Sequence, residues 1–133
     1  MDLKVLIVEN IKELGLLWQR ALQRLGAEVV FVQTQSAAIR CLMDQSYDII
    51  VLDLVLESGS AFAISDFANY KRPEARVFFV TNTSFFSDGS IFQHCSNACG
   101  YIQSSTPPED IAAMVEHYAH GRGSFSNIDS LSA

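Results

Sequence analysis

The sequence predicts an α/β protein with a parallel sheet that carries helices on both faces. Short apolar runs alternate along the chain with segments whose apolar side chains recur every three or four residues. The runs are typical of strands buried on both faces, and the longer segments are typical of amphipathic helices. Five runs alternating with five helical segments favour one α/β domain, and a length of 133 residues fits one domain.

The expected strands are short and apolar, and most of them end at a polar residue. They cover residues 3–8, 29–32, 48–52, 77–80 and 100–103. The run at 48–52 reads Asp-Ile-Ile-Val-Leu and predicts the most deeply buried strand, because it offers no polar face. Enrichment in valine, isoleucine and phenylalanine favours strands over buried helix turns at 29–32 and 77–80.

The expected helices are placed by their capping residues. The first, over 11–25, stops at Gly26, and the second begins after Thr34, a residue suited to an N-cap. The third covers 61–70 and closes before Pro73. A weak fourth helix is expected over 84–97. The last begins with Thr106 as N-cap and a proline at its first position, and it ends at Gly121.

Charge and composition exclude several classes of function. The chain carries 15 acidic and 9 basic residues, a formal net charge of −6, so we expect no nucleic-acid binding and no membrane binding. It contains no long uncharged apolar stretch and no signal-peptide pattern. Three cysteines, an odd number, favour reduced thiols and a cytoplasmic location. We expect one domain over residues 1–121 and a flexible, polar tail over 122–133.

Polar residues follow four of the expected strands and form the candidate site. They are Glu9-Asn10, Asp53, Thr81-Asn82 and Ser104-Ser105. The carboxyl ends of parallel strands meet at one sheet edge, where ligands of such sheets bind. Two carboxylates and a hydroxyl there could hold a hard cation and a phosphoryl group. The residues alone leave two alternatives open, an anion or metal site and ordinary polar strand ends.

Four sequence blocks resemble those of response-regulator receiver domains. They read Leu-Ile-Val-Glu-Asn at 6–10, Ile-Val-Leu-Asp-Leu at 50–54, Phe-Val-Thr at 79–81 and Gly-Tyr-Ile at 100–102, in the family's order and spacing. The resemblance covers residues 3 to about 120. It implies a flavodoxin-like, doubly wound, five-stranded parallel sheet with strand order 2-1-3-4-5 and helices on both faces.

The resemblance also implies a role for each site residue. Asp53 stands at the position of the phosphoryl acceptor, where a carboxylate attacks a phosphohistidine and becomes an acyl phosphate. Glu9 and Asn10 stand where the family holds Mg²⁺ together with the acceptor, and the carbonyl of Val55 would complete the ligands. Thr81 matches the hydroxyl that contacts the phosphoryl group. Tyr101 matches the aromatic side chain that reports phosphorylation to the surface.

Three positions depart from the family pattern. Ser104 stands at the position of a lysine that neutralises phosphoryl charge, and no lysine follows Lys71. Asn10 replaces a carboxylate, which predicts weaker Mg²⁺ binding. Asn82 stands where a small residue is usual and would narrow the entrance of the site.

We therefore expect a stand-alone receiver in phosphorelay signalling that is not an enzyme beyond self-catalysed transfer onto Asp53. The expected partners are a histidine kinase or phosphotransfer protein, a downstream protein that binds the surface of residues 84–118, and a second copy of the chain. The alternative is a degenerate receiver that binds proteins without phosphorylation. A flavodoxin-like ligand-binding protein is disfavoured, because Glu9 occupies the place of a phosphate-binding loop.

Overall fold

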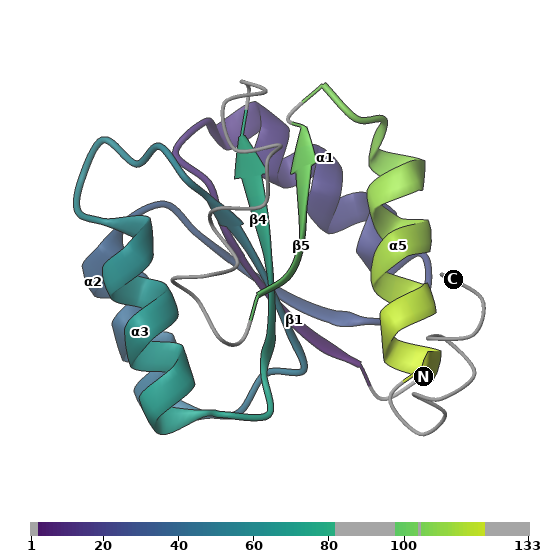
Figure 1. The fold of residues 1–133 in the computed structure, drawn as a ribbon. Helices are drawn as coiled ribbons and strands as arrows, with labels where there is room; N and C mark the ends of the chain where they lie inside the picture. The colour runs from purple at the N-terminus through teal and green to yellow at the C-terminus, as the bar shows by residue number, and fades with distance from the viewer. Residues whose placement is uncertain (1–2, 82–97, 104, 122–133) are drawn as a thin grey trace.

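The computed structural model describes residues 3–81, 98–103 and 105–121, which form a sheet between two layers of helices (Figure 1). The strands are β1 (Lys4–Val8), β2 (Glu28–Val32), β3 (Ile49–Asp53), β4 (Arg76–Thr81) and β5 (Ala98–Gln103). The helices are α1 (Lys12–Gln23), α2 (Gln35–Asp44), α3 (Ala61–Lys71) and α5 (Pro108–Gly121). The weak helix expected over 84–97 and the tail expected over 122–133 lie outside the described residues.

The sheet has the order β2-β1-β3-β4-β5, and each neighbouring pair is parallel. This confirms the expected flavodoxin-like architecture. The register between β4 and β5 shifts once, because Val77 pairs with Ala98 while the next residue, Phe78, pairs with Gly100. The insertion of Cys99 on the β5 side is a local bulge at the sheet edge.

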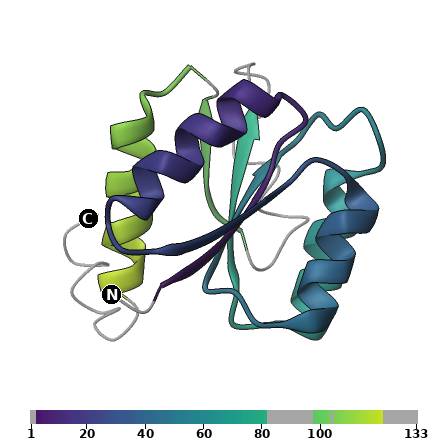
Figure 2. The ribbon, with the colours of Figure 1, turned by 180° about the vertical axis from the view of Figure 1, so that it is seen from behind.

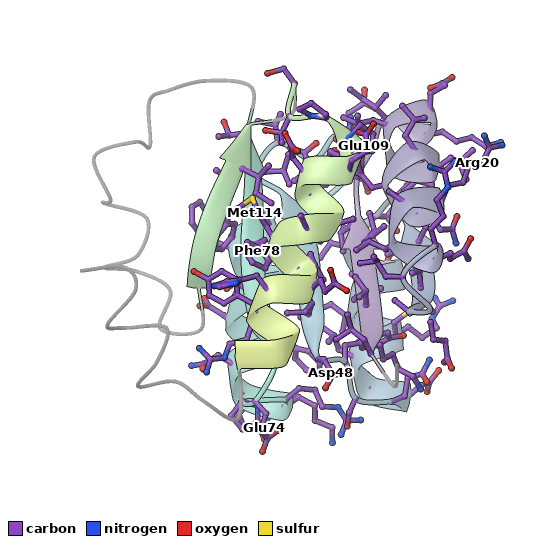
Figure 3. The ribbon with its side chains drawn as sticks, turned by 90° about the vertical axis from the view of Figure 1, so that its right-hand side faces the viewer. Arg20, Asp48, Glu74, Phe78, Glu109 and Met114 are labelled. Atoms are coloured by element: carbon purple, nitrogen blue, oxygen red, sulfur yellow. The ribbon has the colours of Figure 1, made fainter. Side chains whose placement is uncertain are left out.

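The helices cover both faces of the sheet, as expected. Helices α1 and α5 lie together on one face, and α2 and α3 lie together on the other, as Figures 1 and 2 both show. Alternate residues of each strand therefore enter two separate cores. The first core is centred on Trp18 of α1 and Phe78 of β4, and the second on Leu42 of α2 and Phe79 of β4. Figure 3 shows Phe78 beneath α5, where its ring meets the edge of Tyr118 at a centroid distance of 5.0 Å.

Two helix ends follow the capping signals in the sequence. Thr34 caps α2, because its hydroxyl accepts a hydrogen bond from the Ala37 amide at 3.2 Å. Gly26 follows α1 with φ +87°, and its amide donates to the Gln23 carbonyl at 2.9 Å. Glycine adopts this left-handed backbone without steric cost, so the chain turns at Gly26 as predicted, although α1 itself ends at Gln23, two residues before the expected end.

The start of α5 differs from the prediction by one residue. The helix begins at Pro108, so the expected N-cap at Thr106 is wrong and Pro107 precedes the first helical residue. The Pro107 carbonyl accepts hydrogen bonds from the amides of Asp110 and Ile111 at 2.9 and 3.2 Å. A residue that precedes a proline avoids helical backbone angles, so Pro108 excludes Pro107 from the helix.

Helix α1 packs closely against the edge strand β2 at Gly15. The space beside Gly15 is filled by the ring of Phe31, and a Cβ atom built on Gly15 would overlap that ring. Glycine thus sets the distance between α1 and β2. Within the described part of the chain, none of the helices combines the length and the apolar character that crossing a membrane requires.

Candidate functional site

The strand register brings the polar strand ends together at the carboxyl edge of the sheet. Val8 pairs with Leu52, so the next residues, Glu9 and Asp53, lie side by side. Asp53 in turn pairs with Val80, which places Thr81 one residue beyond it on the neighbouring strand. Alternation along β1 and β3 directs Glu9 and Asp53 to the same face, because Ile7 and Val51 both belong to the core under α1 and α5.

Glu9 is a buried carboxyl group that favours its protonated form. Its side chain is 1% exposed, and its Oε2 accepts a hydrogen bond from the Ile11 amide at 3.0 Å. Burial, and after it the neighbouring carboxyl group of Asp53, raises the pKa of Glu9 from 4.5 to about 8. Because desolvation and a like charge both oppose ionisation, Glu9 carries its proton at neutral pH while no cation lies beside it.

Two buried oxygen atoms of the site make no hydrogen bond within the described structure. They are Oε1 of Glu9 and Oδ1 of Asn10. A buried oxygen without a donor costs about 1–3 kcal/mol. The Oδ1 atom of Asn10 therefore calls for a ligand, whereas protonated Glu9 can share its proton with the carboxyl group of Asp53 until a cation displaces that proton. Glu9 and Asn10 both belong to the β1–α1 loop, beside the acceptor position on β3.

Asp53 lies at the end of β3 and is only partly buried, so it is accessible from solvent. Its Oδ1 accepts a hydrogen bond from the Val55 amide at 3.0 Å, a turn that orients the carboxyl group. Val55 is 63% exposed and lies in the loop between β3 and α3. The nucleophile candidate and the expected carbonyl ligand therefore belong to one turn.

This set of residues fits a magnesium ion in donor type. Carboxylate, amide and carbonyl oxygens are the ligands that Mg²⁺ takes, and it is usually held by few carboxylates together with water. The described residues contain no group of three or more His, Cys, Asp or Glu side chains suited to a metal. Among the expected ligands, Glu9 and Asp53 are the two acids, and Asn10 supplies an amide oxygen.

The structure brings four of the expected site residues to one edge of the sheet, whereas some of the others lie outside the described residues. Glu9, Asn10 and Asp53 lie together, and Thr81, 1% exposed, ends the neighbouring strand. Val55 follows Asp53 in the same loop. The backbone of Tyr101 pairs with Phe79 in β5. Asn82, Ser104 and the side chain of Tyr101 lie outside the described residues, so their expected roles stay predictions.

Sequence reasoning missed two residues that contact the site loops, Gln33 and Gln35. They belong to the segment between β2 and α2, and their side chains hydrogen-bond to the loops that follow β1 and β3. Glutamine near the surface is common and carries no motif. The one available signal was topological, since a parallel β2 brings its carboxyl end to the same edge as β1 and β3.

Comparison with solved structures identifies the fold as that of receiver domains. The response regulator DrrB of Thermotoga maritima, an OmpR/PhoB homologue, superimposes with a TM-score of 0.79 at 22% identity, over 90% of this chain and 54% of DrrB. The receiver domain of DrrB, activated by BeF3, gives 0.76 at 25% identity over 90% of this chain and 99% of that domain.

The response regulator TrrA of T. maritima, in complex with Mg²⁺ and BeF, gives a TM-score of 0.75 at 19% identity, over 88% of this chain and 98% of TrrA. No family model and no curated protein sequence matches the chain. The chain thus has the fold of a response-regulator receiver domain and spans about half the length of full DrrB.

Proposed function

We propose that this protein is a receiver of two-component signalling that accepts a phosphoryl group on Asp53 and signals through a protein partner. One observation carries the proposal. The partly exposed carboxyl group of Asp53 interacts with the buried carboxyl group of Glu9, and the next residue, Asn10, has a buried Oδ1 without a hydrogen-bond donor in the described structure. A cation that displaces the Glu9 proton would bind the oxygen atoms of these three side chains, and a cation beside a nucleophilic carboxylate suits phosphoryl transfer.

Glu9, Asn10, Asp53 and the carbonyl of Val55 would hold Mg²⁺. When bound, the ion would neutralise charge on the incoming phosphoryl oxygens. An Asp53 oxygen attacks phosphorus, the P–N bond of a phosphohistidine breaks, and the histidine nitrogen keeps the bonding electrons. The result is an acyl phosphate on Asp53. Thr81 lies on the neighbouring strand, where its hydroxyl could contact the transferred group.

A direct labelling experiment tests this proposal. We expect incubation with acetyl phosphate and Mg²⁺ to add the mass of one phosphoryl group to the intact protein. Asp53→Asn should show no gain, and chelation of Mg²⁺ should abolish the gain in the unaltered protein. A lysine-containing receiver run in parallel supplies the positive control. Absence of label under conditions that label the control would refute phosphorylation of Asp53.

A second candidate function is a receiver that binds its partner without phosphorylation. The observation that favours it is the raised pKa of Glu9, about 8, combined with Asn10 in place of an acid, since both reduce the negative charge that attracts Mg²⁺. Ser104 in place of a lysine favours the same function for a different reason, because no ammonium group at that position would neutralise phosphoryl charge. For this function, Asp53→Ala should leave partner binding intact. A phosphorylation switch predicts instead that Asp53→Ala either abolishes partner binding or makes it independent of phosphoryl donors.

The partners follow from the same proposal. A histidine kinase or phosphotransfer protein would supply the phosphoryl group in the cytoplasm. A downstream protein would read the surface of residues 84–118, whose part from 84 to 97 lies outside the described residues. The surface can be tested by mapping chemical shifts of the protein with and without BeF3, with Asp53→Ala as the variant that should not respond.

A further inference from the structure

We infer that the segment Gln33–Thr34–Gln35, between β2 and α2, is a brace that positions both loops of the candidate magnesium site. This inference rests on the proposed function for its purpose and on the hydrogen bonds of the segment for its geometry. The segment supplies no ligand of its own. It joins the β1–α1 loop on one side and the β3–α3 loop on the other, and these loops carry the proposed ligands.

The first half of the brace holds the β1–α1 loop. The side-chain amide of Gln33 donates a hydrogen bond from Nε2 to the carbonyl oxygen of Asn10 at 3.0 Å. One residue earlier, the Glu9 amide donates to the Val32 carbonyl at 3.1 Å, which continues the β1–β2 ladder into the loop. Two bonds from the end of β2 thus fix the backbone from which the Glu9 and Asn10 side chains extend.

The second half of the brace holds the β3–α3 loop. The Oε1 atom of Gln35 accepts a hydrogen bond from the Ser60 amide at 2.8 Å, and the Gln35 amide donates to the Ser58 carbonyl at 3.2 Å. Between these contacts lies Gly59, with φ +103°. The Gln35 side chain fills the space that a Cβ atom on Gly59 would need. Glycine at this place therefore permits both the turn and the close approach of Gln35.

Val55 lies between two fixed points of the β3–α3 loop. The loop begins with the Leu54 amide bonded to the Val80 carbonyl at 2.8 Å, and it ends at the contacts of Gln35. Thr34 caps α2 and so fixes the helix turn from which Gln35 extends. Because the carbonyl of Val55 must face the ion at a defined distance, an unfastened loop end would lower Mg²⁺ affinity.

The test is a series of variants measured by Mg²⁺ titration and by amide hydrogen exchange. Gln35→Ala should lower Mg²⁺ affinity about tenfold, the scale of losses when groups that orient ligands are removed. It should also speed exchange of the Ser60 amide, and Gln35→Glu, which keeps an acceptor oxygen, should restore slow exchange. Gln33→Ala should lower affinity less. Ser36→Ala, an exposed neighbour in α2, is the matched control and should change neither quantity.

The outcomes separate this inference from the proposed function. Wild-type affinity in Gln35→Ala, or an unchanged Ser60 exchange rate, would overturn the brace while leaving Asp53 phosphorylation standing. Failure of the unaltered protein to bind Mg²⁺ would refute the magnesium site. The exchange rates of the Ser60 amide, compared among the unaltered protein, Gln35→Ala, Gln35→Glu and Ser36→Ala, would then still decide whether Gln35 holds the loop.

Discussion

The raised pKa of Glu9 predicts that Mg²⁺ binding depends steeply on pH. With a pKa of about 8, about one molecule in ten carries an ionised Glu9 at pH 7. A cation that binds Glu9 Oε1 must displace the proton, so its apparent affinity follows the ionised fraction. That fraction rises roughly ninefold from pH 6 to pH 7 and roughly fivefold from pH 7 to pH 8, and it levels off above pH 9.

Calorimetric titration in buffers of different ionisation enthalpy measures this linkage. At pH 7 we expect release of about 0.9 proton per Mg²⁺ bound, because Glu9 is then mostly protonated. Glu9→Gln cannot lose a proton, so its Mg²⁺ affinity should be weak and flat between pH 6 and pH 9. A flat affinity in the unaltered protein, with no proton released, would show that Glu9 is already ionised and would refute the reasoning.

The same group makes the Mg²⁺-free protein less stable at high pH. The pKa of Glu9 in the folded protein, about 8, lies above its ordinary value of 4.5, so the folded state binds the proton more tightly than the unfolded chain. The contribution is fully present below pH 4.5 and is lost as the pH rises through 8. We expect a loss of a few kcal/mol, at most about 5 kcal/mol for a shift of this size, and no such loss in Glu9→Gln.

Three further predictions concern the packing that supports the site. Gly15→Ala should destabilise the protein by about 1–3 kcal/mol in chemical denaturation, despite the higher helix propensity of alanine, because the new Cβ atom would overlap the Phe31 ring. In the Phe31→Ala protein, where that ring is absent, the same change should stabilise the fold by about 1 kcal/mol. Thr34→Ala should cost about 1 kcal/mol by loss of the α2 cap, whereas Ser36→Ala should cost almost nothing. Trp18 is fully buried, and its Nε1 has no hydrogen-bond partner within the described structure. Trp18→Phe should therefore cost about 1 kcal/mol or less, far below the 3–5 kcal/mol of Trp18→Ala, because the indole N–H gains nothing from burial.

The sequence predicted the fold well because its signals are local and repeated. The run at 48–52 is apolar after Asp48, which predicted a buried strand, and the structure places residues 49–53 as β3 between β1 and β4. Thr34 and Gly26 marked helix ends by their own backbone chemistry. The error at Thr106 arose because two successive prolines, Pro107 and Pro108, could each occupy the first helical position. The helix begins at Pro108, since a residue before a proline avoids helical backbone angles.

The candidate site was predictable in position but less so in its chemistry. Strand ends at 9, 53 and 81 had to meet, since parallel strands share one carboxyl edge. The protonated state of Glu9 depends on burial by residues distant in sequence, which no local pattern contains. The contacts of Gln33 and Gln35 depend on loop conformations, and the side chains that make them resemble ordinary surface glutamines.

The division of the sheet into apolar strand interiors and polar strand ends has an evolutionary consequence. Residues that stabilise the fold, such as Val51 and Phe79, are different from those that would perform its chemistry, such as Asn10 and Asp53. A lineage can therefore exchange the residues at the edge one at a time while its core sequence stays under constant selection for packing. A single change at that edge, Asn10→Asp, would add a third acid beside Glu9 and Asp53 while leaving the residues of both cores as they are.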